Sequence, residues 1–459
     1  MPRLVIVSNR VAAPHQPRSG GLVVALDAAL RETGGIWFGW SGKATRDGTR
    51  ELHRTEAGNV EYVTLDLTEA DIAGYYDGFS NRTLWPALHY RLDLVEYSRE
   101  THVVYRQVNA CIAERLAALL RPDDLVWIHD YHLLPLAGEL RARGVENALG
   151  LFLHVPFPPP DVARALPHHA SVFGAMAAYD LVGFQTARDS DNFEAYLRDA
   201  IGRGELAPGR GRPPPMIRAF PISIDEAEFA DVAQRARGST TLRGLRESLG
   251  RSGLAIGVDR LDYSKGLVEK FEAFGEFIRR HPDLAGQLTL LQVAPVSRGG
   301  VPSYRELRHE LERIAGHING AHSEPQWVPI RYVNRNFSRQ QVAGFYAAAR
   351  MALVTPLRDG MNLVAKEFVA AQDPQDPGVL VLSRFAGAAE QLSGAVLVNP
   401  YDIGGVADAI HAALQMDVDE RRERHAGSLR SLREQSIHWW TASFLHALST
   451  RAGTSTRVA

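Results

Sequence analysis

The stretch TPLRDGMNLVAKEFVAA, from Thr355 to Ala371, changes from a strand pattern to a helical pattern within a few residues. It follows the apolar run MALV, so a strand, a polar turn and a helix form half of a βαβ unit. The main-chain N–H groups from Gly360 to Leu363 fall at the start of this helix, where such groups lack a partner within the helix and form a seat for a phosphate. The stretch therefore predicts a parallel α/β sheet with a ligand at the carboxyl end of one strand.

Two acidic residues frame this helix start. From Asn362 to Glu367 a helix rises about 7 to 8 Å, which is on the order of the distance from a diphosphate to the ribose of a nucleotide. A diphosphate at the helix start would leave Glu367 near ribose hydroxyls and Asp359 near the group that the diphosphate carries. Plain capping of the helix by an Asp or Asn explains the same residues equally well, so both interpretations stay open at this point.

Length and composition restrict the class of protein. The chain has 459 residues, which predicts two or three domains, and 51 Lys plus Arg stand against 53 Asp plus Glu. The resulting net charge of -2 gives no sign of a nucleic acid or an anionic membrane as partner. A single cysteine, Cys111, excludes an intramolecular disulfide and a cysteine zinc site, and suggests a core residue in a reducing compartment. No apolar run reaches the roughly 18 residues of a membrane span, and the N-terminus enters a strand without a signal-peptide pattern, so we expect a cytoplasmic protein with no membrane partner.

The order of the patterns predicts two α/β domains. Short apolar, β-branched runs alternate with helical patterns along the whole chain, as in parallel sheets. A Gly- and Pro-rich segment and the polar stretch from Arg235 to Gly250 separate two such series. We therefore expect an N-terminal domain over residues 1–235 and a C-terminal domain over residues 236–435. The polar tail over residues 449–459 is predicted to be disordered.

Polar residues follow many of the predicted strands. Ligands of open parallel sheets bind at the carboxyl ends of the strands, so these residues are candidates for a site. Cations and glycines come after some strands, and histidines and acids after others. They are Arg10, Gly20, Gly21, His129, Asp130, His132, His154, Arg260, Lys265 and Arg298. Singly, each suits a surface or structural role, but together they predict a cleft that holds phosphates and hydroxyls.

Several competing motifs do not survive inspection. GRGR at residues 209–212 begins like a dinucleotide fingerprint, but three prolines follow where the helix should start. No GxxxxGK[ST] motif occurs, which excludes a P-loop kinase. DVDE at residues 417–420 opens a helical pattern, where acids suit the positive helix end, and His129 and His132 have no third ligand nearby. We therefore expect no metal site.

The longer motifs resemble those of a known family. VSNR, SGGL, WFGWSG, FSNRTLWPALHYR, HDYHLLP, FLHVPFPPP, GVDRLDYSKG, APVSRGG and PLRDGMNLVAKE occur in the same order as in the trehalose-6-phosphate synthase family, from about residue 3 to about residue 445. The resemblance implies a GT-B architecture, in which two Rossmann-like, doubly wound parallel-sheet domains face each other across a cleft, and a helix over residues 436–448 crosses back to the first domain.

The resemblance also implies a reaction. Members of this retaining glycosyltransferase family move glucose from UDP-glucose to glucose 6-phosphate, giving α,α-trehalose 6-phosphate and UDP in trehalose biosynthesis. The nucleotide sugar and the sugar phosphate would be the only small-molecule partners, with no cofactor and no metal. A homo-oligomer, the strictness for UDP over GDP or ADP, and regulation stay open.

Carried over position by position, the family pattern assigns an acceptor and a donor set. The acceptor set is Arg10, Tyr76, Trp85, Asp130 and Arg298, with Arg10 and Arg298 on the 6-phosphate. The donor set is Gly20, Gly21, Arg260, Lys265, Phe337, Leu363, Val364, Ala365, Lys366 and Glu367, with the last on the ribose. His154 and Asp359 would hold the donor glucose, and together with Arg260 and Lys265 they are the expected catalytic residues.

Three alternatives remain at this point. A sister transferase could use the same donor grip on another phosphorylated acceptor, such as glycerol 3-phosphate. A catalytically silent module could sense sugar phosphates, and a nucleotide-sugar epimerase could share the fold. One departure from the family pattern is Ser223 in FPISID, where glycine is frequent; it bears on the geometry of that loop.

Overall fold

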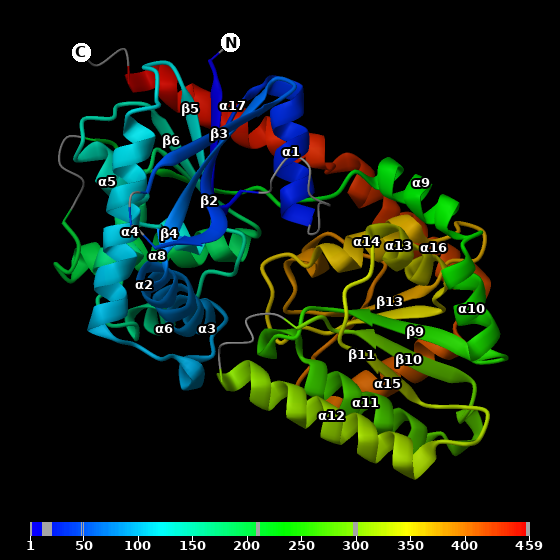
Figure 1. Cartoon of the computed structure of the whole chain (residues 1–459). Coiled ribbons are helices and arrows are strands. Elements are labelled where there is room, and N and C mark those ends of the chain that lie inside the picture. Colours follow the sequence, from blue (N-terminus) through cyan, green and yellow to red (C-terminus); the bar gives the residue numbers. More distant parts are fainter. Residues whose placement is uncertain are drawn as a thin grey trace. The chain divides into compact units, whose positions relative to one another are not determined.

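The structure is a computed structural model that describes residues 2–11, 21–46, 48, 50–207, 212–296 and 302–455. The chain divides into two compact units (Figure 1). The first unit consists of residues 1–221 and 438–459, and the second of residues 222–437. The division into two α/β units agrees with the sequence-based expectation, and each unit is built around its own sheet.

The first unit contains an eight-stranded sheet in the order β3-β4-β2-β1-β5-β6-β7-β8. Its strands are β1 (Leu4–Arg10), β2 (Gly35–Thr45), β3 (Leu52–Ala57), β4 (Val60–Thr68), β5 (Leu125–His129), β6 (Ala148–Phe152), β7 (Leu181–Phe184) and β8 (Met216–Ala219). All pairings are parallel except that of β3 with β4. The central strand β1 is apolar and buried from Leu4 to Val7, as expected for a strand covered on both faces.

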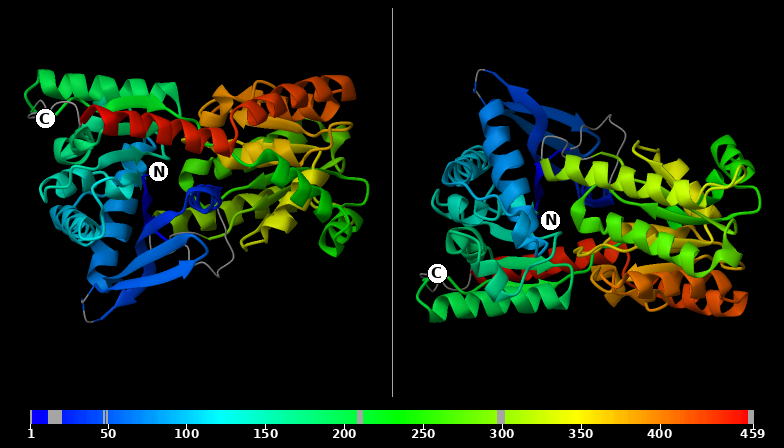
Figure 2. Two further views of the ribbon diagram at one scale, coloured as in Figure 1. Left: turned by 90° about the horizontal axis from the view of Figure 1, so that it is seen from above. Right: turned by 90° about the horizontal axis from the view of Figure 1, so that it is seen from below.

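The first unit also contains helices, most of which connect its strands. They are α1 (Gly21–Thr33), α2 (Glu69–Asp71), the π-helix η1 (Ile72–Leu84), α3 (Trp85–Leu88), α4 (Arg99–Ala117), α5 (Leu136–Arg141), α6 (Pro160–Arg164), α7 (His169–Val172), α8 (Ala187–Gly202) and α17 (Ile437–Ser455). Figure 2 shows α17, the red segment, alongside the other elements of this unit. Its Trp440 and Phe444 pack on Trp127 of β5 at ring distances of 4.8 and 4.6 Å.

The second unit contains a six-stranded parallel sheet in the order β11-β10-β9-β12-β13-β14. Its strands are β9 (Gly253–Val258), β10 (Leu288–Val293), β11 (Ile330–Val333), β12 (Met351–Val354), β13 (Val379–Ser383) and β14 (Val396–Val398). Its helices are α9 (Glu226–Ala236), α10 (Thr240–Leu249), α11 (Leu267–Arg280), α12 (Pro302–His322), α13 (Arg339–Ala348), α14 (Leu363–Ala371), α15 (Ile403–Gln415) and α16 (Val418–Glu434). Helices α11, α12 and α15 cover one face of the sheet, and α9, α13 and α14 cover the other (Figure 1).

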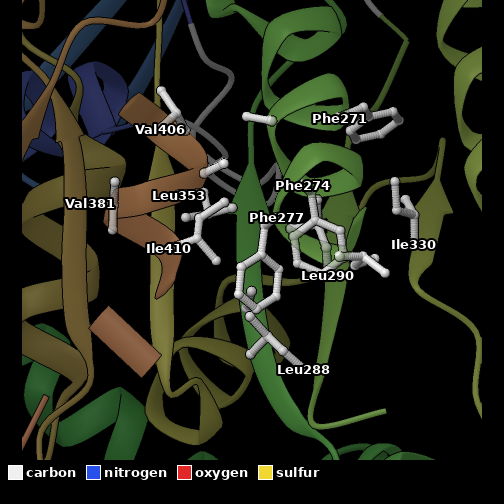
Figure 3. Packing of buried hydrophobic residues seen from close by; sticks show 14 of the residues in the cluster. Phe271, Phe274, Phe277, Leu288, Leu290, Ile330, Leu353, Val381, Val406 and Ile410 are labelled. Carbon is white, nitrogen blue, oxygen red and sulfur yellow. The ribbon is translucent and has the colours of Figure 1, made fainter. Parts of the chain in front are cut away.

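Helix α11 packs an aromatic stripe against the sheet of the second unit. Phe271, Phe274 and Phe277 are buried and lie with Leu288 and Leu290 of β10 in one apolar cluster (Figure 3). Burying such a side chain contributes roughly 1.5 to 3 kcal/mol, so these aromatic residues hold the helix on the sheet. Their place in the core leaves the polar end of the sheet, and not this face, for a ligand.

The boundary between the units differs from the expected one at residue 235. The division falls between Pro221 and Ile222. Residues after 222 belong to the second unit because α9 buries Phe229, Val232 and Ala233 within it. The polar stretch that suggested a boundary contains α10, whose Leu242 is buried. A change of composition therefore marked two half-exposed helices and not a linker.

The C-terminal tail is also more ordered than its composition predicts. Helix α17 continues to Ser455, so most of the segment expected to be disordered is helical. Leu448 is fully buried, and Arg451 donates hydrogen bonds to the main-chain oxygens of Asp180 and Pro214 at 3.3 and 2.5 Å. The polar residues of this segment give no sign of the Arg451 contacts, because the partners are main-chain atoms distant in sequence.

Candidate active site

Both sheets have a point at which the order of strands reverses. In the first unit the chain runs from the central strand β1 outward to β2 and β4 on one side, and to β5, β6, β7 and β8 on the other. In the second unit it runs from β9 to β10 and β11, and then to β12, β13 and β14 on the opposite side. Open α/β sheets bind ligands at the carboxyl ends of the strands that flank this point. We call the end of β1 and β5 the first switch point, and the end of β9 and β12 the second.

Asp130 lies at the first switch point, directly after β5. Its backbone has φ 77° and ψ 170°, a region that residues other than glycine rarely adopt. Its N–H donates to the oxygen of Phe152 at 2.8 Å, and its carboxylate accepts from the N–H of His154 at 3.4 Å. Backbone strain of this kind collects at functional sites. The structure thus places a predicted acceptor residue where a ligand is expected.

His154 follows β6 and pairs with His129, the last residue of β5. Nδ1 of His129 and Nε2 of His154 share a hydrogen bond of 3.0 Å. Burial lowers the pKa of His154 to about 3 and that of His129 well below its usual value, so both rings are neutral near pH 7. Nδ1 of His154 also lies 3.4 Å from the amide nitrogen of Gln185. A sugar that contacts this ring would have to replace the long contact with Gln185.

An aromatic wall stands beside Arg10 at the end of β1. The guanidinium carbon of Arg10 lies 5.8 Å from the ring centre of Trp40, and Tyr76 lies 5.6 Å from Trp40 and 5.8 Å from His132. Gly42 has φ +86°, and a Cβ there would lie 2.4 Å from Nε of Arg10. Sequence reasoning assigned no role to Trp40 and Gly42. Their signal was the motif WFGWSG on β2, the parallel neighbour of β1.

Trp85 is nearly buried. Only 5% of its surface is exposed, and its ring packs on His89 and Tyr131 at 4.1 and 5.7 Å. Its contact with the acceptor stays a prediction. Gly21 is the first residue of α1, while Gly20 and Arg298 lie outside the described residues.

An ion pair spans the second switch point. Nζ of Lys265, after β9, donates to Oδ2 of Asp359, after β12, at 2.5 Å, and the amide nitrogen of Asn362 donates to the same oxygen at 3.0 Å. Asn362 has φ 75°, and its side chain accepts from the N–H of Ala365 at the start of α14. The capping interpretation of this turn is therefore correct, and the same turn also carries an acid that pairs with a cation from the loop after β9.

The loop after β9 is held close to the end of β12. Gly266 has φ +61°, and a Cβ at this position would lie 2.2 Å from the oxygen of Thr355. Arg260 lies 3.8 Å from the buried carboxylate of Asp262, while about half of its side chain stays exposed. Asp262 also accepts from the N–H and the hydroxyl of Ser264 at 3.0 Å. The loop thus presents two predicted donor cations, Arg260 and Lys265, from a folded turn.

Glu367 and Phe337 belong to neighbouring helical segments. Glu367 is half-buried on α14, and burial raises its pKa to about 7, against the opposing charge of Arg339. Phe337 precedes α13 and lies between Arg335, at 4.7 Å, and Phe345, at 5.1 Å. A carboxylate with a pKa this close to neutrality is a common mark of a binding or catalytic group.

The side chain of Lys366 lies in the interior. It is fully buried, and Nζ donates to the oxygen of Ile222 and to Oε1 of Gln391, both at 2.6 Å. Burial lowers its pKa to about 7. The amine therefore holds α14 to the first residue of the second unit, and the donor contact predicted for the segment Leu363 to Glu367 stays a prediction. The neighbouring Leu363 and Val364 are half-buried, and Ala365 is buried.

Within the part of the chain that the structure describes, no group of three or more His, Cys, Asp or Glu side chains is placed to hold a metal ion. None of the helices in the described ranges combines the length and apolar character needed to cross a membrane.

Two doubly wound α/β units, the second with an ion pair between the loops after β9 and β12, are typical of enzymes that bind nucleotides or phosphorylated sugars. The chain belongs to glycosyltransferase family 20, which it matches over residues 5–450.

Similar proteins are trehalose-6-phosphate synthases. The trehalose-6-phosphate synthase of Sinorhizobium fredii is 50% identical over 461 residues, covering 98% of this chain and 98% of its own. A crystal structure of an α,α-trehalose-phosphate synthase (UDP-forming) from Burkholderia vietnamiensis has a TM-score of 0.94 and 47% identity, covering 98% of this chain and 99% of that one. Another, from Burkholderia xenovorans in complex with glucose-6-phosphate, has a TM-score of 0.92 and 44% identity, covering 97% of this chain and 100% of that one.

Proposed function

We propose that this chain transfers glucose from UDP-glucose to glucose 6-phosphate, giving α,α-trehalose 6-phosphate and UDP with retention of configuration. The observation that carries the proposal is the contact between Lys265 and Asp359 across the second switch point, at the start of α14. Family membership and the UDP-forming relatives support the same reaction.

The donor would occupy the second unit. Cleavage of the anomeric C–O bond builds negative charge on the leaving diphosphate, and fixed cations with helix N–H groups stabilise such charge. Arg260, Lys265 and the residues from Leu363 to Ala365 would supply them, while Glu367 would accept from the ribose hydroxyls. Asp359 would face the glucose, because it stands beside the cation that receives the diphosphate.

The acceptor would occupy the first unit. Arg10 offers a bidentate cation for the 6-phosphate, and Arg298 from the second unit would be its counterpart. Tyr76 and Asp130 would contact the sugar, with Asp130 accepting from hydroxyls. His154 would reach the donor glucose in place of its contact with Gln185. Transfer requires the acceptor hydroxyl to lie beside the anomeric carbon of the donor.

Incubation of the protein with UDP-glucose and glucose 6-phosphate tests this proposal. We expect UDP release and a product whose two anomeric protons both show α couplings in nuclear magnetic resonance. Parallel reactions with GDP-glucose, ADP-glucose and a panel of sugar phosphates define the strictness of each site. A better rate with glycerol 3-phosphate, or no UDP release with any acceptor, would overturn the assignment.

We also propose that turnover needs no metal and takes place in the cytoplasm. The positive field at the diphosphate would come from Arg260, Lys265 and the helix start, and the unpaired Cys111 suits a reducing compartment. Full activity in excess EDTA is expected, and a loss that added metal reverses would contradict it. Fractionation of cells that make the protein should find the activity in the cytosolic fraction.

A further inference from the structure

A buried polar network lies beneath the loop that carries the two donor cations. Lys270 of α11 is 1% exposed, and its Nζ donates to Oδ2 of Asp259 at 2.7 Å and to Oε1 of Gln292 at 3.0 Å. The amide nitrogen of Gln292, on β10, donates to the same carboxylate at 3.3 Å. Three elements of the second unit, the end of β9, α11 and β10, thus meet in one charged group.

The backbone of β9 is shaped to admit this network. A Cβ at Gly257 would lie 2.1 Å from Oε1 of Gln292 and 3.0 Å from Nζ of Lys270. Any side chain at this position would displace the amide or the ammonium. The absence of a side chain on a central strand therefore serves the network, since glycine itself weakens a strand.

Stability alone is a poor explanation for the network. Removing two charges from water costs about as much as their attraction returns, and apolar residues of similar volume often hold a fold equally well. Phe271 and Phe274 of the same helix belong to the main apolar cluster of this unit (Figure 3). An apolar side chain at position 270 would extend that cluster.

The position of Lys270 links both ends of the cation loop. Its side chain holds Asp259, the residue before Arg260, and its main-chain N–H donates to the oxygen of Gly266, the residue after Lys265, at 3.0 Å. The side chain therefore ties the first residue of the segment 259–266 to α11, and the main-chain bond at the other end is the first bond of that helix. Outside the network, the contacts of Asp262 and the ion pair of Lys265 order the loop. Main-chain bonds also hold it, since the N–H groups of Asp259 and Leu261 donate to the oxygens of Val293 and Pro295, both at 3.0 Å.

We propose that Lys270 is a positioning residue for the donor, which holds Asp259 and thereby sets Arg260 and Lys265 in the geometry that receives the nucleotide diphosphate. The inference deepens the proposed function and rests on it for the identity of the ligand. Preorganised cations stabilise a leaving group without reorganising during the reaction. Holding them in place therefore offsets the free-energy cost of burying an ion pair.

The first test replaces Lys270 by methionine in the full chain. We expect the dissociation constant for UDP, measured by calorimetry, to rise about 10-fold to 100-fold, as for the loss of a charge-assisted hydrogen bond. Hydrogen exchange at residues 259–266 of the ligand-free protein should become at least about tenfold faster, because local order there is lost. Affinity for glucose 6-phosphate should not change.

Two further variants separate positioning from stability. Arg421→Met removes another buried cation of this unit, which donates to the oxygen of Pro377 and pairs with Asp376. It should lower the unfolding temperature but leave UDP affinity and exchange at residues 259–266 as in the wild type. The triple variant K270M/D259L/Q292L removes the whole network, and we expect its unfolding temperature to return toward the wild-type value while UDP affinity stays low.

The outcomes distinguish the two proposals. Wild-type UDP affinity in K270M, or recovery of both unfolding temperature and UDP affinity in the triple variant, would overturn the positioning role. Failure of the wild-type protein to bind UDP would overturn the proposed donor instead. The exchange rates would still decide whether Lys270 orders the segment.

Discussion

The two switch points share a topology but bury different kinds of polar group. At the first, the buried pair is neutral, because burial lowers the pKa of both His129 and His154. At the second, a half-buried ion pair joins Lys265 to Asp359, and the buried ion pair of Lys270 and Asp259 lies beneath it. Burial disfavours charge unless a partner retains it. The difference fits a second site that keeps ion pairs beside a ligand whose own charge grows during the reaction, whereas the histidine pair at the first switch point carries no charge.

The largest effect should come from removing the cation at the second switch point. In Lys265→Met the charge is lost while the length of the side chain is nearly kept. We expect kcat to fall about 10²-fold to 10³-fold, as when one group that stabilises developing charge is removed. The rate of UDP release at saturating UDP-glucose and glucose 6-phosphate measures it.

A surface ion pair of the first unit serves as the control for this variant. Arg54 lies 2.9 Å from Glu61, and about half of its side chain is exposed. Exposed pairs contribute roughly 0 to 1 kcal/mol, so Arg54→Met should leave kcat unchanged. If Lys265→Met kept wild-type kcat, the ionic second site would be structural, and the contrast between the two switch points would lose its functional meaning.

The next effect belongs to the first switch point. In Arg10→Gln a hydrogen-bonding side chain remains without its charge, and we expect kcat/KM for glucose 6-phosphate to fall about 10-fold to 150-fold, from the roughly 1.5 to 3 kcal/mol of a charge-assisted hydrogen bond. UDP affinity should hold, because Arg10 belongs to the other unit. Calorimetry with each ligand separates these effects. Loss of UDP affinity with an unchanged response to glucose 6-phosphate would reverse the assignment.

The parts of this molecule that could be predicted from sequence are those set by local patterns. The alternation of apolar runs with helical patterns was enough to predict two parallel sheets. The position of Asp130, Lys265 and Asp359 directly after strands was enough to predict them as candidate site residues. These positions follow from a general property of parallel sheets, whose carboxyl ends meet at one edge. Strand β3 escaped prediction because most of its side chains are polar and exposed.

The rest depended on partners distant in the chain. Lys366 and Glu367 are neighbours in one motif, but successive residues of a helix point in directions about 100° apart. Only the fold shows that the first meets Ile222 and Gln391 in the interior and the second stays half-buried. The strained backbone of Asp130 could not be predicted either, because nothing in the sequence distinguishes this position from an ordinary turn.

A smaller effect concerns the pH dependence of the donor site. Burial raises the pKa of Glu367 to about 7, so this carboxyl is protonated below that pH and ionised above it. Ribose hydroxyls donate best to the ionised form, and affinity scales with the fraction of protein in the competent state. We expect UDP-glucose to bind about tenfold more weakly at pH 6 than at pH 8. Calorimetry with UDP-glucose avoids the titration of a terminal phosphate.

The matched variant for this prediction is Glu367→Gln. It keeps the size of the side chain but cannot titrate, so its affinity for UDP-glucose should be the same at both pH values. The raised pKa of Glu367 also makes the stability of the folded protein depend on pH. Between about pH 4.5 and 7 the unfolded chain is ionised here while the folded protein holds the proton, so this residue lowers stability as pH rises through that window. If the affinity of Glu367→Gln for UDP-glucose changed with pH as that of the wild type does, Glu367 would not be the source of the pH dependence.

The smallest expected effect compares the two positive-φ residues, Asp130 at the first switch point and Asn362 at the second. Asp130 has φ 77° with ψ 170°, where only glycine is at ease, and holding a side chain there costs about 1 to 3 kcal/mol. Glycine would remove that strain but would lose about 0.5 to 1 kcal/mol through the greater freedom of the unfolded chain. Asp130→Gly should therefore be more stable than the wild type, by about 1 kcal/mol.

Asn362→Gly should not gain in the same way. Asn tolerates its left-handed conformation, and replacing a helix cap by glycine changes stability by only a few tenths of a kcal/mol. Scanning calorimetry should show an unfolding temperature about 2 to 4 °C higher for Asp130→Gly and nearly unchanged for Asn362→Gly. Asp130→Gly should at the same time lose turnover with glucose 6-phosphate, because the carboxylate is gone. A stabilised but inactive variant would mean that the first switch point stores strain to aim one acid, whereas a destabilised one would mean that Asp130 is needed mainly for the fold.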